Sequence, residues 1–146
     1  VVLPAPGDHL VTADGPLALG REGGFDIEQI EGATWVLSYD PLAVALVLSK
    51  VTREDISEIP LPPEIVIEED RENQRPVALG RWGSSILIAY RGRLWSRVDD
   101  EWISLLPERD SWPMLPAHAW QSPPRIFGDG GMVAWPWGEI EEFRAL

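Results

Sequence analysis

Two nearly identical strings, sixty residues apart, limit what this chain can fold into. The first is "PLALGREG", residues 16–23, and the second is "PVALGRWG", residues 76–83. Aligning residues 16–35 with residues 76–95 gives 8 identities in 20 ungapped positions, whereas chance would give about one or two for this composition. A third copy, "PRIFGDGG", residues 124–131, keeps the proline and both glycines at the same spacing. The chain is therefore predicted to contain three imperfect repeats.

Each copy leads into short runs of β-branched and aromatic residues that are separated by turn residues. The second copy is followed by "SSILIAY", "RLWSRV" and "EWISLL", with "RG" and "DD" between the runs. The first copy is followed by "FDIEQI", "ATWVLSY" and "LAVALVL", and the third by "MVAW" and "EIEEFRAL". These patterns are typical of antiparallel hairpins. Gly32, Gly92 and Gly138 are expected to supply the positive φ that tight hairpin turns require.

The predicted fold is a mainly β single domain over residues 1–146, built from three hairpin or meander units. The units span about residues 16–75, 76–123 and 124–146. Three units of about 49 residues suit a closed, trefoil-like arrangement or a propeller-like one. Because the third unit is short, the strand "HLVT", residues 9–12, is predicted to complete it and to close the ring from both ends of the chain.

Three segments need separate interpretation. "VTREDISEIP", residues 51–60, is predicted to form one short helical turn that Thr52 caps and Pro60 ends. "DPLAVALVLSKV", residues 40–51, has the Asp-Pro start of a helix, but its register with "DEWISLL" favours a strand. "SWPMLPAHAWQSPP", residues 111–124, is predicted to be a long loop, because its prolines exclude a helix interior or a central strand.

The charge balance limits the possible partners. The chain carries 24 acidic and 12 basic residues, a net charge of −12. Such a field repels phosphate backbones and anionic membrane surfaces and attracts cations, so no nucleic acid and no membrane is expected as a partner. The longest apolar run, "LAVALVL" at residues 42–48, is far below the roughly 18 residues of a membrane span. With no secretory signal recognised at the amino terminus, a cytoplasmic location is expected.

Motifs for catalysis or metal binding are lacking. There is no cysteine, so thiolate metal sites and disulfides are excluded. Ser84 and Ser85 do not fit Gly-x-Ser-x-Gly, and "GREGG" and "FGDGG" lack the Lys-Ser/Thr of a phosphate loop. The acidic run "EEDRE", residues 68–72, lacks the Asp-x-Asp-x-Asp-Gly spacing of a calcium loop. No catalytic residue, cofactor or metal ligand is predicted; a hydrolase with paired carboxylates stays an alternative only because acids are abundant.

The stretch "RGRLWSRV", residues 91–98, is the first candidate binding site. On an extended strand Arg91, Arg93, Trp95 and Arg97 point to one face. Three guanidinium groups around an indole could bind an anion or a carboxylate. The alternative interpretation is structural: the tryptophan recurs as Trp35 in the first repeat, as a core residue would, and the arginines pair with acids on neighbouring strands.

The proline-rich loop is the second candidate, because it carries Trp112, His118 and Trp120. Together with Trp135 and Trp137 these rings could stack on a sugar, or they could fasten the loop to the end of the barrel. The leading hypothesis is a non-enzymatic interaction domain, such as a bacterial adaptor, inhibitor or immunity-type protein, that binds a basic protein partner through loops and the arginine-aromatic face. The alternative is a carbohydrate-binding module that uses the loop tryptophans.

Overall fold

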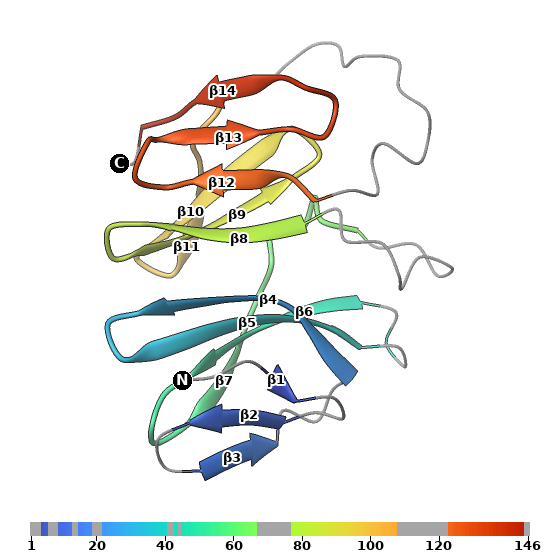
Figure 1. Ribbon diagram of the computed structural model, residues 1–146, viewed down its shortest axis with the longest axis vertical. Helices are drawn as coiled ribbons and strands as arrows, with labels where there is room; N and C mark the ends of the chain where they lie inside the picture. The colour runs from blue at the N-terminus through green and yellow to red at the C-terminus, as the bar shows by residue number, and fades with distance from the viewer. Residues whose placement is uncertain are drawn as a thin grey trace. The chain divides into compact units, whose positions relative to one another are not determined.

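The computed structural model of the protein is built from β-strands. It describes residues 4–5, 9–12, 15–18, 22–40, 43, 45–66, 77–107 and 123–144, with side chains described from residue 26 onward. No helix occurs among these residues (Figure 1). The prediction of a mainly β fold is confirmed. Within the same residues, no helix is long and apolar enough to cross a membrane.

The chain forms two compact units, Val1–Asn73 and Gln74–Leu146. In the first unit one antiparallel sheet contains β1 (Pro4–Ala5), β2 (His9–Thr12) and β3 (Gly15–Ala18). A second sheet contains β4 (Glu22–Ile30), β5 (Ala33–Asp40), β6 (Ala45–Val51) and β7 (Ile56–Ile59). In the second unit one sheet contains β8 (Val77–Trp82), β9 (Ser85–Tyr90), β10 (Arg93–Val98) and β11 (Glu101–Ser104). The other contains β12 (Arg125–Phe127), β13 (Met132–Ala134) and β14 (Ile140–Glu142).

Every sheet formed by the described strands is an open meander, and none closes on itself. The closed trefoil-like or propeller-like arrangement is therefore not seen. The strand "HLVT" is β2, and it pairs with β1 and β3 instead of completing the carboxyl-terminal sheet, where β14 pairs with β13 alone. The prediction of closure by the chain ends was wrong, because a local hairpin loses less chain entropy than a pairing across the whole chain. The division into three repeats stays a prediction.

Tight turns connect the central hairpins. Glu31 and Gly32 have φ values of 47° and 81°, and Arg91 and Gly92 have values of 43° and 81°. Two successive positive φ angles define the type I′ turn, whose twist matches that of the flanking strands. Gly138 has a φ of 98°. The positive φ expected at these three glycines is confirmed.

The segment around Thr52 is a hairpin, and the predicted helical turn is wrong. The Asp55 amide donates to the Thr52 Oγ1 at 3.2 Å, and the Thr52 amide donates to the Asp55 carbonyl at 2.9 Å. These bonds close the turn between β6 and β7, whose residues pair from Leu48 with Ile59 to Val51 with Ile56. The ladder is favoured because a single helical turn is an unfavourable nucleus without further turns to follow it. The strand expected within residues 40–51 is confirmed in its described part, where β6 covers Ala45–Val51.

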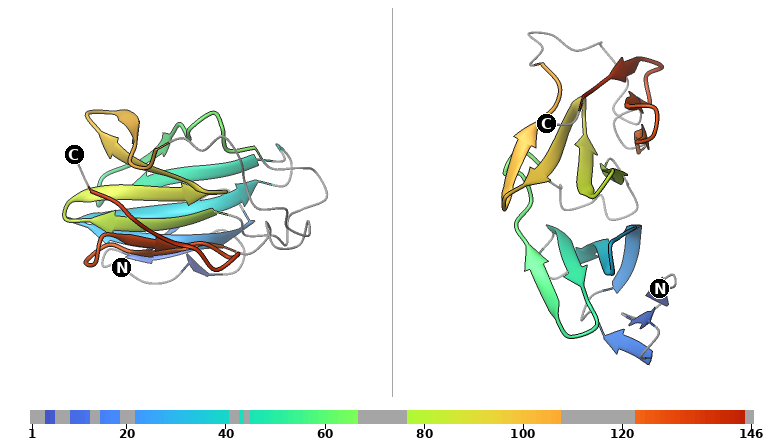
Figure 2. Two further views of the ribbon diagram at one scale, coloured as in Figure 1. Left: turned by 90° about the horizontal axis from the view of Figure 1, so that it is seen from above. Right: turned by 90° about the vertical axis from the view of Figure 1, so that its left-hand side faces the viewer.

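The second unit has its core between its two sheets. Leu87, Ala89 and Leu94 from the four-stranded sheet cluster with Val133, and Trp135 and Phe143 belong to the same cluster. Figures 1 and 2 show β12, β13 and β14 as a layer beside β8–β11. The two layers meet closely along β8 and β12: a Cβ on Gly80 would lie 2.6 Å from an Ile126 side-chain carbon, and one on Gly128 would overlap the Arg81 carbonyl oxygen.

Charge and aromatic residues are divided unequally between the units. Residues 1–73 contain four basic and fifteen acidic side chains, a net charge of −11, whereas residues 74–146 contain eight and nine, a net charge of −1. Seven of the eight tryptophans lie in the second unit, and only Trp35 lies in the first. Intrinsic tryptophan fluorescence therefore reports mainly on the second unit.

We expect Gly128→Ala to lower the free energy of unfolding of the second unit by roughly 2 kcal/mol, because the added methyl meets a backbone oxygen that cannot rotate away. Gly130→Ala is the matched control: its Cβ would meet the flexible end of Met132 at 3.2 Å, so it should cost clearly less. Urea unfolding followed by tryptophan fluorescence measures both. Equal unfolding midpoints for the two variants would contradict the close approach of β12 to β8.

Candidate functional site

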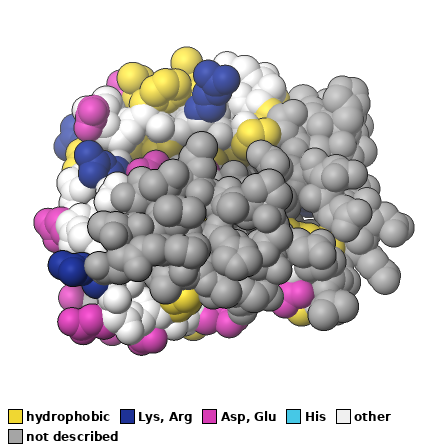
Figure 3. Space-filling view, turned by 60° about the horizontal axis from the view of Figure 1, so that its bottom comes forward, with side chains coloured by type: hydrophobic (Ala, Val, Ile, Leu, Met, Phe, Trp, Pro, Cys, Tyr) yellow, Lys and Arg dark blue, Asp and Glu magenta, His cyan; other side chains and the backbone are white. Residues whose placement is uncertain are grey.

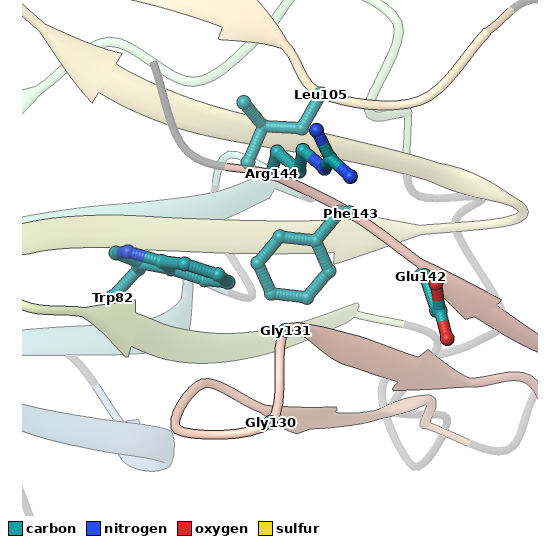
Figure 4. Close-up of a pocket in the computed structure, with 7 residues that line it drawn as sticks. All are labelled: Trp82, Leu105, Gly130, Gly131, Glu142, Phe143 and Arg144. Atoms are coloured by element: carbon teal, nitrogen blue, oxygen red, sulfur yellow. The ribbon is translucent and has the colours of Figure 1, made fainter.

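A pocket of about 640 Å³ lies within the second unit (Figure 4). This volume is typical of sites for small molecules. Its walls are apolar side chains, its floor is a glycine turn, and two charged residues stand at its edge. The lining residues are Trp82, Leu105, Gly130, Gly131, Glu142, Phe143 and Arg144.

The aromatic wall depends on Gly131. The rings of Trp82 and Phe143 meet edge to face, with centroids 5.1 Å apart and an interplanar angle of 60°. Gly131 has a φ of 64°, and a Cβ there would lie 2.7 Å and 2.9 Å from two Trp82 ring carbons. The Phe143 amide donates to the Gly131 carbonyl at 2.8 Å. The turn therefore fixes Phe143 directly and leaves room for Trp82 to lie over it.

Two exposed charges flank Phe143 in the chain. Glu142 and Arg144 are exposed, and no hydrogen bond or ion pair joins either one to a described residue. Figure 4 shows Arg144 on the side of Leu105 and Glu142 on the other side of Phe143. The lining contains no histidine, cysteine or serine. This arrangement suits a bound group with an apolar body and polar substituents.

The predicted arginine-tryptophan strand is β10, and its tryptophan is part of the protein interior. Trp95 is 5% exposed and pairs with Ile88 of β9 and Ser104 of β11. Leu94, on the opposite face of the strand, is fully buried. The alternative interpretation of Trp95 as a core residue is thus the one that its burial supports, and its indole is not presented at the surface.

The three arginines near Trp95 have different surroundings. Arg97 places its guanidinium carbon 5.2 Å from the centroid of the Trp102 ring, and the strand register pairs these two residues. Arg91 lies in the turn before β10 with a φ of 43°, and not on the strand as predicted. Its guanidinium carbon is 5.4 Å from the centroid of the Tyr90 ring. Arg93 is exposed and makes no hydrogen bond or ion pair with a described residue. Arg91 and Arg97 thus contact rings of their own sheet, and anion binding by these arginines stays a prediction.

Trp112, His118 and Trp120 lie outside the described residues, so their predicted role stays a prediction. Trp135 and Trp137 stack on each other with centroids 5.3 Å apart and an interplanar angle of 1°. Trp135 is 3% exposed, so it belongs to the core and cannot present a face to a sugar. Among the described residues, no three histidine, aspartate or glutamate side chains lie together as a metal site would require.

Sequence reasoning missed Trp82, Phe143 and Trp102. The contact of Trp102 with Arg97 could have been predicted from the two-residue turn Asp99-Asp100. This turn, with φ values of 50° and 65°, pairs Val98 with Glu101 and hence Arg97 with Trp102. Trp82 and Phe143 had no such signal, because they lie 61 positions apart in the sequence and only the packing of the two sheets brings them together.

Comparisons with models of protein families, with curated proteins and with solved structures find no match to this chain. The function must therefore be argued from the chain's own residues.

We expect Arg97→Ala to lower the free energy of unfolding by about 0.5–1 kcal/mol, because it removes the cation from the face of Trp102. Arg93→Ala, on the same strand and with the same change of charge, should stay within about 0.5 kcal/mol of the wild type. Urea unfolding of both variants provides the comparison. An equal loss in the two would show that the contact with Trp102 contributes nothing beyond charge.

Proposed function

We propose that this protein is a non-enzymatic interaction domain whose first unit binds a basic protein partner. The division of charge carries this proposal: residues 1–73 have a net charge of −11, and residues 74–146 have a net charge of only −1. A charge set by solubility alone has no reason to gather in one half of the chain. Concentrated charge of one sign attracts an oppositely charged surface and accelerates its association.

The described part of the first unit presents this charge at its surface. Figure 3 shows several acidic side chains, with basic ones among them, on the face that it draws. Glu54 and Glu64 are exposed and have no hydrogen bond or ion pair with a described residue. Lys50, the only lysine in the chain, lies with its Nζ 5.4 Å from the centroid of the Trp35 ring. The carboxylates of Glu54 and Glu64 are therefore available to a partner's cations. Their field reaches over the Debye length, which is about 8 Å at physiological salt.

The test is a pull-down from source-cell lysate with the full chain as bait, accompanied by a defined probe, oligolysine. The charge variant is Glu54→Lys with Glu64→Lys in the first unit. The matched control is Glu101→Lys with Asp129→Lys in the second unit, at positions that are also exposed. Both variants change the net charge from −12 to −8, so they differ only in where the charge is lost. The first should reduce retention of the basic partner several-fold, and the second should leave it nearly unchanged.

The salt dependence of partner retention is the second measurement in this experiment. Retention should fall steeply between roughly 50 mM and 500 mM salt, because screening shortens the reach of the acidic field. An equal loss of partner retention in the two variants would mean that the total charge of the chain determines binding and that the first unit has no special part in it. Retention that salt does not affect would remove the electrostatic basis of the proposal.

A second candidate function, carbohydrate binding, is favoured by the aromatic pocket. Trp82 is half-buried, with Phe143 beside it and the carboxylate of Glu142 at the edge. Sugar sites combine an aromatic face with nearby polar groups in this manner.

If sugars bind here, titration of a glycan panel should show saturable heat or a fluorescence change that Trp82→Ala abolishes. Trp102→Ala is the control, because Trp102 is also half-buried but lies outside the pocket lining. Binding that survives Trp82→Ala would place the sugar elsewhere, and a panel without any binding would eliminate this candidate.

A further inference from the structure

The outer face of the β12–β13–β14 sheet is exposed and largely apolar. Val133 and Ile126 point inward to the core, so the alternate residues point outward. The register arranges the outward residues in two rows across the three strands. One row is Arg125, Ala134 and Ile140, and the other is Phe127, Met132 and Glu142. We refer to these six residues as the outer face.

Large apolar side chains are exposed on this face. Ile140 is 66% exposed and Phe127 is 48% exposed. Few other large hydrophobic side chains among the described residues are exposed to this degree. Ile140 and Phe127 stand at opposite corners of the outer face, with Ala134 and Met132 between them on the middle strand. An exposed apolar patch of this kind commonly marks a contact surface.

The two remaining corners carry opposite charges. Arg125 and Glu142 are both exposed, and neither has a hydrogen bond or ion pair with a described residue. From ordinary strand geometry these corners are about 12 Å apart, which is too far for an ion pair within one molecule. Among the described residues, the outer face therefore holds a cation and an anion that do not pair with each other or with a neighbour.

This arrangement is complementary to itself. In a dimer with a two-fold axis along the diagonal from Phe127 to Ile140, each of these side chains meets its own copy. The same rotation places Arg125 of each copy opposite Glu142 of the other, so two equivalent charge pairs form. The other diagonal would bring Arg125 against Arg125, and an axis along or across the strands would place each charge over an apolar side chain. With this axis the strands of the two sheets cross at roughly 70°, as strand geometry gives, which is near the orthogonal class of sheet packing.

We propose that the outer face docks on the outer face of a second copy of this chain, with Arg125 and Glu142 paired across the two-fold axis. The net charge of only −1 on residues 74–146 leaves this unit with little repulsion of its own. The face comprises six residues, fewer than the roughly 20–30 per partner of a standard interface. The dimer is therefore reversible, with a dissociation constant in the micromolar to millimolar range.

Analytical ultracentrifugation of the full chain from about 10 μM to 1 mM, a range set by the size of the face, tests the proposal. Wild type should pass from monomer to dimer across this range. Arg125→Glu and Glu142→Arg should each raise the dissociation constant at least about tenfold, because each places like charges opposite one another. The double variant Arg125→Glu/Glu142→Arg restores both pairs at an unchanged net charge of −12 and should recover the dimer.

Apolar variants provide a reading that does not depend on charge. Phe127→Ser should weaken the dimer, whereas Val66→Ser, at a residue that is 63% exposed in the first unit, should not. Near-UV circular dichroism of each variant establishes that it is folded. A wild type that stays monomeric at every concentration overturns the proposal, as does a dimer that is indifferent to the charge reversals. A folded double variant that fails to dimerise also overturns it. None of these outcomes bears on binding of a basic partner by the first unit.

Discussion

The second unit depends on the close approach of two backbones, β8 and β12. Gly128 lies where any side chain would overlap the Arg81 carbonyl, and Ile126 fills the space beside Gly80. This contact brings the three-stranded sheet near enough for Val133 to share a core with Leu87. The aromatic pocket follows from the same contact, because Trp82 ends β8 and Phe143 follows β14. Neither glycine is required by its φ angle; each is required by the space that its neighbour occupies.

The local parts of this fold could be predicted from the sequence, and the associations between sheets could not. A two-residue turn with positive φ, such as Arg91-Gly92, fixes which residues pair on either side of it. The strands on either side of such turns were therefore predictable to within a residue or two. Which sheet packs on which depends on contacts between distant residues, such as Ile126 with Gly80. The expected closure through "HLVT" was a prediction about such distant contacts, and it was wrong. In the structure this strand pairs with β1 and β3, its neighbours in the chain.

The candidate site shows the same limit. In a half-buried strand, polar and apolar residues alternate, and this alternation identifies the face that packs on the core. The centre of β10 is buried on both faces, because Leu94, Trp95 and Ser96 are all nearly inaccessible to solvent. The sequence of such a strand shows no alternation of polar and apolar residues from which its buried face could be predicted. The sequence pattern therefore could not reveal that Trp95 is buried, and it placed Arg91 on the strand, whereas Arg91 lies in the turn before β10 with a φ of 43°. The pocket was not predictable, because Trp82 and Phe143 become neighbours only when the sheets pack.

The open sheets have a consequence for solubility. A sheet that does not close leaves backbone N–H and C=O groups unpaired along its edge strands, and such edges can join those of other molecules into aggregates. On β7, an edge strand of the first unit, Glu58 is exposed and next to Ile59, and the turn before the strand carries Glu54. Charged side chains at an edge discourage this pairing. The carboxylates on β7 and in the turn before it therefore disfavour pairing of this edge with the edge of another molecule.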